Sequence, residues 1–222
     1  MKLVFSAMAL CGLAACGGSS VGGAGGGADM SPQVPTLSQF ETSVRSFGAT
    51  ADRIDLLTDT VPRNIPSSGT STFAGPALLS VEGFTNSYAM TGDSRLTINF
   101  ANDDMSGGVT NFRGVDETGR GVNVAGQIAF TDGLVGSDDT SGLFAVDFNG
   151  NLTAGSDRIA LDGIAIGNFE GNRTSGNIRT RAIQAVSGTS GSFIVDQGFP
   201  PSMTATMNGN TAIADFAFVG EN

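Results

Sequence analysis

Residues 122–130 read Val-Asn-Val-Ala-Gly-Gln-Ile-Ala-Phe, with an apolar residue at every second position except where Gly126 takes that place. Successive side chains of a β-strand point to opposite faces, so this period of two predicts a strand with one buried face. Two further stretches repeat the pattern. We therefore expect the following side chains to share one interior: Leu96, Ile98, Phe100, Val122, Val124, Ile128, Phe130, Phe144, Val146 and Phe148.

Turn signals separate these stretches. Asn-Gly occurs at 149–150 and at 208–209, in each case between strand-like segments. This pair suits a type I′ hairpin turn, because both central residues of that turn need a positive φ. Many short strands with glycine-rich turns are typical of an antiparallel barrel or sandwich, and the 33 glycines are enough to supply corners and bulges.

One segment changes phase in the middle. Ile159 and Leu161 share one face of the expected strand, whereas Ile164 and Ile166 share the other. A β-bulge or a corner reverses which residues point inward. We therefore expect a bulge or a corner at Asp162-Gly163.

A single helix precedes the strands, over residues 36–60. Its apolar positions recur at spacings of three and four, which places them on one face: Phe40, Val44, Phe47, Ala51 and Ile54. Ser38 with Glu41 forms a capping-box pattern at its start. Pro62 and Pro66 lie beyond its end, and the residue before a proline disfavours helix. The pattern leaves open whether the helix packs on the following domain, plugs it or binds a partner.

The chain begins with an export signal over residues 1–15. Lys2 precedes a run from Leu3 to Leu10 that is too short to span a bilayer. Leu13-Ala14-Ala15-Cys16 follows and resembles the lipobox of bacterial lipoproteins, which are cut before the cysteine and acylated on its thiol with chains such as palmitate. A plain secretory signal cut near Ala15 is the alternative. Residues 16–35 are rich in glycine, which predicts a flexible tether.

Composition excludes several kinds of chemistry. The chain has no His, and its only cysteines are Cys11, in the signal, and Cys16. The mature chain then offers no Ser-His-Asp triad, no Cys-His dyad and no imidazole metal site. With 11 basic and 21 acidic residues the net charge is −10, which becomes −11 once Lys2 is removed. An acidic chain disfavours nucleic acid as a partner. We expect no enzyme, no cofactor and no metal.

Two groups of charged residues are candidate sites. Asp103-Asp104 and Asp138-Asp139 share a spacing to a following Ser-Gly, and paired carboxylates in loops can bind calcium. An EF-hand needs more ligands at set positions than these pairs provide, so solvated turn residues are the favoured explanation of both pairs. Arg173, Arg179 and Arg181 cluster around one loop and could grip an anion, although a solvated strand face also accounts for Arg179 and Arg181.

The stretch from Ile65 to Gly75 resembles the opening barrel strand of transferrin-binding protein B-like lipoproteins. The stretches 96–107 and 146–153 resemble that family's recurrent strand-turn-strand unit, and Phe216-Ala217-Phe218 resembles its closing strand. The resemblance covers about 65–222 and implies an eight-stranded antiparallel barrel in a lipid-anchored protein. It implies no binding residues, because the family's partners contact variable loops that this chain does not match.

Together these patterns predict an all-β protein, a soluble eight-stranded barrel over 65–222 preceded by one N-terminal helix. Transmembrane barrels carry aromatic girdles, whereas this chain has one Tyr and no Trp. The expected location is the outer membrane, to which lipid on Cys16 would anchor the protein, either at the cell surface or at the periplasmic face. The expected role is a binding module that captures a protein or a small solute. The alternative is a structural or assembly lipoprotein without a soluble ligand.

Overall fold

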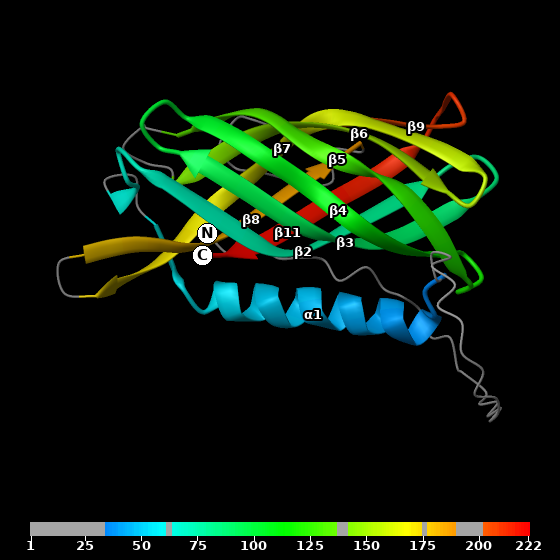
Figure 1. The fold of residues 1–222 in the computed structure, drawn as a ribbon, viewed down its shortest axis with the longest axis horizontal. Helices are drawn as coiled ribbons and strands as arrows, with labels where there is room; N and C mark the ends of the chain where they lie inside the picture. The colour runs from blue at the N-terminus through cyan, green and yellow to red at the C-terminus, as the bar shows by residue number, and fades with distance from the viewer. Residues whose placement is uncertain (1–33, 61–63, 137–141, 175–176, 190–201) are drawn as a thin grey trace, which may run out of the picture. The chain divides into compact units, whose positions relative to one another are not determined.

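A computed structural model describes residues 34–60, 64–136, 142–174, 177–189 and 202–222. Eight long antiparallel strands close into a β-barrel, which confirms the predicted fold class (Figure 1). The elements are α1 (Leu37–Asp55), β1 (Thr58–Asp59), β2 (Thr70–Glu82), β3 (Ser87–Asn99), β4 (Asp104–Asp116), β5 (Gly121–Val135), β6 (Leu143–Ala154), β7 (Asp157–Thr174), β8 (Asn177–Gly188), β9 (Ser202–Met207), β10 (Asn210–Thr211) and β11 (Ile213–Glu221).

The barrel closes through β7, which changes its partner along its length. The ring runs from β2 through β7 in chain order, and β8 and β11 complete it, with β11 paired to β2. Ile159–Ile164 of β7 pair with β9, and from Ile166 onward β7 pairs with β8 instead. The short β9 therefore takes up the part of the β7 edge that β8 does not reach.

The predicted alternating side chains form part of the barrel core. Eight of the ten expected interior residues are buried, and Val122 and Val124 are partly buried against the same core. Aromatic rings from different strands meet inside it. Phe169 contacts Phe73, Phe100 and Phe144, while Phe216 and Phe218 contact Phe148 and Phe130. Period-two alternation thus identified the inward face correctly.

Helix α1 packs on the outer surface of the barrel and does not plug it (Figure 1). Its buried residues include Phe40, Phe47, Ala51 and Ile54, as predicted, while Val44 is partly buried. The capping box is formed by Thr36 and Gln39, so the prediction of Ser38 with Glu41 is wrong by two residues. The helix also ends earlier than predicted, at Asp55, because β1 begins three residues later and pairs with β7.

The helix runs along the barrel from one end to the other. Pro35, just before it, lies against Gly121, where a Cβ atom would overlap the proline carbonyl. Arg53, in its last turn, pairs with Glu221 at 2.7 Å. We call the barrel end with the turns at 83–86, 117–120, 155–156 and 208–209 the Pro35 end. We call the opposite end, with the turn at 100–103, the Glu221 end.

The two Asn-Gly pairs adopt different structures. Asn208 and Gly209 form the turn between β9 and β10, with φ values of 53° and 79°, as the type I′ prediction requires. Asn149 and Gly150 lie in the middle of β6, so the predicted turn there is wrong. Gly150 is paired on both sides, and a Cβ on it would come within 2.8 Å of Ile128 Cγ1. The glycine makes room inside the barrel and does not reverse the chain.

The predicted bulge at Asp162-Gly163 is also wrong. Strands β6 and β7 pair without a register shift along their whole contact, from Asp157 to Asn168 of β7. Ile164 and Ile166 change phase because they point to the outer face of the sheet, where Ile164 is 39% exposed and Ile166 is buried. What changes here is the partner strand, since β9 gives way to β8 between these two residues.

Candidate functional site

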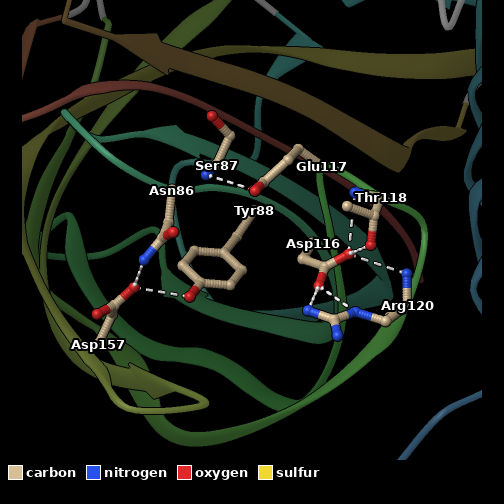
Figure 2. Close-up of polar contacts among 8 residues, drawn as sticks. All are labelled: Asn86, Ser87, Tyr88, Asp116, Glu117, Thr118, Arg120 and Asp157. Carbon is tan, nitrogen blue, oxygen red and sulfur yellow. Dashed lines mark hydrogen bonds and ion pairs between the residues drawn. The ribbon is translucent and has the colours of Figure 1, made fainter.

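The Pro35 end of the barrel carries a polar network centred on Asp157. Its carboxylate accepts hydrogen bonds from Asn86 Nδ2 at 2.6 Å, Tyr88 Oη at 2.7 Å and Asn208 Nδ2 at 2.9 Å. Figure 2 shows the Tyr88 ring lying across the barrel end with its hydroxyl directed at Asp157. The network therefore ties the turn between β2 and β3 and the turn between β9 and β10 to the start of β7.

The network holds its two acidic groups in fixed protonation states. The bonds from Asn208, Tyr88 and Asn86 lower the pKa of Asp157, because each donor favours the carboxylate form. Burial and the bond to Asp157 raise the pKa of Tyr88 well above its usual value. Tyr88 is thus a permanent donor and Asp157 a permanent acceptor near neutral pH. The donor and acceptor roles are therefore fixed near neutral pH, and the three bonds hold the segments of this barrel end together.

A second carboxylate organises the neighbouring turn between β4 and β5. Asp116 accepts bonds from Thr118 Oγ1 at 2.6 Å and from the backbone N–H groups of Thr118 and Arg120. Its other oxygen pairs with the Arg120 guanidinium at 2.9 Å (Figure 2). The pKa of Asp116 falls to about 2, chiefly through the Thr118 hydroxyl. Glu117 beside it accepts the backbone N–H of Ser87, which connects this turn to the start of β3.

A buried carboxyl lies on the outer face of the barrel, near the end of α1. Glu170 of β7 is only 6% exposed, and β1 pairs with β7 beside it, with Asp59 opposite Glu170. Burial first, and then the charge and hydrogen bond of Asp59, raise the pKa of Glu170 to about 8. Its Oε2 atom has no hydrogen-bond partner among the described residues. Nearby, Gln184 Nε2 donates to Asp55 Oδ1 at 2.8 Å, which joins the helix end to β8.

A hollow of about 450 Å³ lies on the outer surface of β5, β6, β7 and β9. Its polar rim includes Thr131, Asp147, Asn149, Asp162 and Thr204, and Ile164 adds an apolar side chain. Among the described residues that line it two are acidic, Asp147 and Asp162, and none is basic. The hollow is thus suited to ligands that donate hydrogen bonds or carry positive charge.

The structure brings together few of the residues singled out from sequence. Cys16 and Asp138-Asp139 lie outside the described residues. Asp103 and Asp104 lie in and after the turn between β3 and β4, where Asp103 has a positive φ of 57°. Within the described ranges, no group of three or more His, Cys, Asp or Glu residues is arranged to hold a metal ion.

The predicted arginine cluster falls on the hairpin of β7 and β8. Arg181 is exposed, and its backbone carbonyl accepts the N–H of Asn222. The side chains of Arg173 and Arg179 lie outside the described residues. In the part of the chain that the structure describes, no helix is long and apolar enough to cross a membrane.

Sequence reasoning missed Asp157, which accepts three side-chain hydrogen bonds, and Glu170, whose pKa is raised by burial. Each is a single acidic residue in a strand, with no local motif. Their partners lie far away in the chain, 71 residues away for Asn86 and 51 for Asn208 in the case of Asp157.

Comparisons with family models, with curated proteins and with solved structures found no match to the chain. The function is therefore inferred from the sequence and the geometry.

Proposed function

We propose that the chain is a lipid-anchored, non-enzymatic binding module of a bacterial outer membrane. The observation that carries this proposal is the sequence Leu13-Ala14-Ala15-Cys16 after a short apolar run, which resembles a lipobox. A run from Leu3 to Leu10 is too short to hold the protein in a bilayer by itself. Acyl chains on Cys16 would provide a stable hold, since two or more chains anchor firmly where one does not.

Binding fits the described residues better than chemistry does. Asp116 and Asp157 are held ionised by the donors around them, which suits a structural role for both carboxylates. The core inside the strands is apolar and aromatic. The outer hollow around Asp147 and Asp162 is the surface we assign to capture, with a ligand that is cationic or rich in hydrogen-bond donors. The likeness to transferrin-binding protein B-like lipoproteins supports a receptor-like role.

The anchor is tested by expressing the full chain with labelled palmitate in a bacterium. The wild-type chain should carry the label and sediment with outer membranes. Cys16→Ala should lose the label and leave the membrane pellet, because its acyl chains are missing. Cys11→Ala is the matched control and should behave like the wild type. A Cys16→Ala chain that still sediments with membranes, beside an unlabelled wild type, would replace this proposal with a soluble exported barrel.

The capture surface is tested with the mature chain immobilised and exposed to envelope and medium proteins. Asp147→Asn with Asp162→Asn should lose a specific partner that the wild type retains, because both carboxylates of the hollow become neutral. Asp104→Asn, an exposed acid at the Glu221 end, is the control and should retain that partner. Equal capture by all three chains would exclude the hollow as the binding surface.

A further inference from the structure

Apolar side chains stand exposed at both ends of the barrel. At the Pro35 end these are Val34, Phe84 and Ile213, which are 53%, 97% and 53% exposed. Toward the Glu221 end Leu56 and Leu134 are 86% and 69% exposed. Exposure alone therefore does not favour either end as a docking surface. The path of the chain favours the Pro35 end, because the described part begins there with Val34, next to the Pro35 contact with Gly121.

The distance along the chain makes the two ends unequal. Cys16 lies 18 residues before Val34, and a glycine-rich chain of that length has a root-mean-square span of about 23 Å. Helix α1 has 19 residues, which corresponds to about 28 Å at 1.5 Å per residue. An acylated Cys16 would therefore hold the Pro35 end near the bilayer, with the Glu221 end farther away by the length of the helix.

Phe84 occupies an unusual place for an aromatic residue. It lies in the turn between β2 and β3, closed by the bond from Gly83 N to Asn86 O at 2.9 Å. Such turns favour Gly, Asn, Asp and Ser, and an almost fully exposed phenylalanine gains nothing from the fold. Ile213 is near it, since Ile213 pairs with Glu82 two residues before Phe84.

The turn that presents Phe84 is fixed on its C-terminal side. Asn86 binds Asp157, and the backbone N–H of Ser87 binds Glu117 (Figure 2). An aromatic side chain that is already held in place loses little conformational freedom when it inserts into a lipid surface. Aromatic side chains also prefer the boundary between hydrocarbon and headgroups. The polar network of this end thus has a second consequence, which is to hold Phe84 outward.

The charges of the Pro35 end favour a net-neutral lipid surface. Asp116 is paired with Arg120, and Asp157 is buried among three donors. Exposed Glu82 and Glu117 remain, with exposed Arg158 at this end and exposed Arg113 three residues before the end of β4. Among the described residues of this end basic side chains do not outnumber acidic ones, so we expect little attraction to anionic lipids. Contact with zwitterionic headgroups does not require an excess of basic residues.

We propose that the Pro35 end docks on the bilayer surface, with Phe84 inserted at the boundary between headgroups and acyl chains. The proposal rests on the lipid anchor at Cys16, which supplies the local concentration that one aromatic side chain cannot supply by itself. Docking fixes the orientation of the barrel, because the Pro35 end then faces the membrane and the Glu221 end points into the aqueous compartment.

The absence of tryptophan from the chain makes a direct test possible. Phe84→Trp and Leu134→Trp each introduce a sole tryptophan at an exposed apolar position, at opposite ends of the barrel. The full lipidated mature chains are reconstituted into vesicles of palmitoyl-oleoyl phosphatidylcholine. A parallel set contains phosphatidylcholine brominated on its acyl chains, which quenches nearby tryptophan. The Phe84→Trp emission should shift to the blue and be lost to bromine, while the Leu134→Trp emission should change little.

The outcomes separate docking from anchoring. If the chain floats with the vesicles but both tryptophans are quenched equally or not at all, the docking proposal is overturned and the anchor stands. If the lipidated chain does not float, both proposals are overturned. A blue shift that bromine does not quench and that grows with protein concentration would assign Phe84 to a contact between copies, which also overturns docking.

Discussion

The side chains of Glu170 and Asp59 share a hydrogen bond on the outer face of the barrel, where β1 pairs with β7. Two carboxyl groups can share such a bond only if one of them holds a proton. Asp55 adds a further negative charge from the end of α1, which also disfavours the ionised form of Glu170. The site therefore keeps Glu170 protonated at a pH where a free glutamate is ionised.

This pair predicts a stability that falls as pH rises. The pKa of Glu170 is about 8 in the folded chain against an ordinary 4.5, so between these values the folded state binds more protons than the unfolded state, and unfolding becomes easier with rising pH. The loss amounts to at most about 5 kcal/mol over the whole range from 4.5 to about 8, since one pKa unit corresponds to about 1.4 kcal/mol. Burial raises the pKa of Asp215 too, which acts in the same direction.

Urea unfolding at pH 5 and at pH 8 measures this effect. Glu170→Gln should remove most of the difference, because the amide keeps the shape and has no proton to lose. Glu82→Gln changes an exposed glutamate and serves as the control, with the slope of the wild type. Equal pH dependence in Glu170→Gln and the wild type would show that the pair does not govern the profile.

For Asp157 we expect the opposite pH dependence, a stability that falls as pH is lowered. Its pKa is lowered, so its stabilising effect is present above the ordinary aspartate pKa and is lost as pH falls through the folded value. Asp157→Ala should cost roughly 2–4 kcal/mol at pH 7, because it leaves buried donors without an acceptor. Tyr88→Phe should cost less, about 1–2 kcal/mol, since Asn86 and Asn208 still satisfy the carboxylate. Equal unfolding midpoints for both variants and the wild type would contradict this account.

Two phenylalanines of opposite exposure test the interior. Phe148 is 2% exposed against the Phe216 ring, and Phe84 is 97% exposed. Phe148→Ala should lower the free energy of unfolding by about 3–5 kcal/mol, whereas Phe84→Ala should change it by less than about 0.5 kcal/mol. Thermal melts followed by circular dichroism give both values. A large effect at Phe84 would mean that this residue supports the fold, and its proposed membrane role would lose its basis.

Sequence reasoning succeeded where the signal is local and repeated. The inward face of the strands around Phe130 and Phe148 follows from alternation alone, because the geometry of a strand imposes it. It failed where the environment of a residue is set by distant strands. Asn149-Gly150 has the composition of a turn, yet pairing with β5 on one side and β7 on the other keeps it extended. The local preference of Asn-Gly for a turn contributes less free energy than the hydrogen bonds to two neighbouring strands.

The candidate sites were predictable to a smaller degree. Asp157 and Glu170 acquire their properties from partners on other hairpins, so no spacing in the sequence indicates them. The outer hollow depends on the meeting of β9 with β7, which joins Thr204 to Asp162 across 42 residues. The capping box was misplaced by two residues because Thr36-Gln39 and Ser38-Glu41 both fit the same short pattern.

Gly150 offers the sharpest test of the corrected turn. An added methyl group would lie 2.8 Å from Ile128 Cγ1 and 3.1 Å from the Gln127 carbonyl oxygen. Gly150→Ala should therefore destabilise the barrel by about 1–3 kcal/mol through overpacking. Gly48→Ala is the control, because nothing lies within 4 Å of its Cβ position in α1, and alanine there should add up to about 1 kcal/mol of stability.

The cause of the Gly150→Ala effect is separable by a double-mutant cycle with Ile128→Ala. The single Ile128→Ala change should cost about 2–5 kcal/mol, because it empties a buried position. In that background the added methyl group no longer meets the isoleucine, so Gly150→Ala should cost less than it does in the wild type. A coupling of about 1 kcal/mol is expected for residues in direct contact. Strictly additive costs, measured by urea unfolding of all four chains, would mean that Gly150 does not face Ile128 within the barrel.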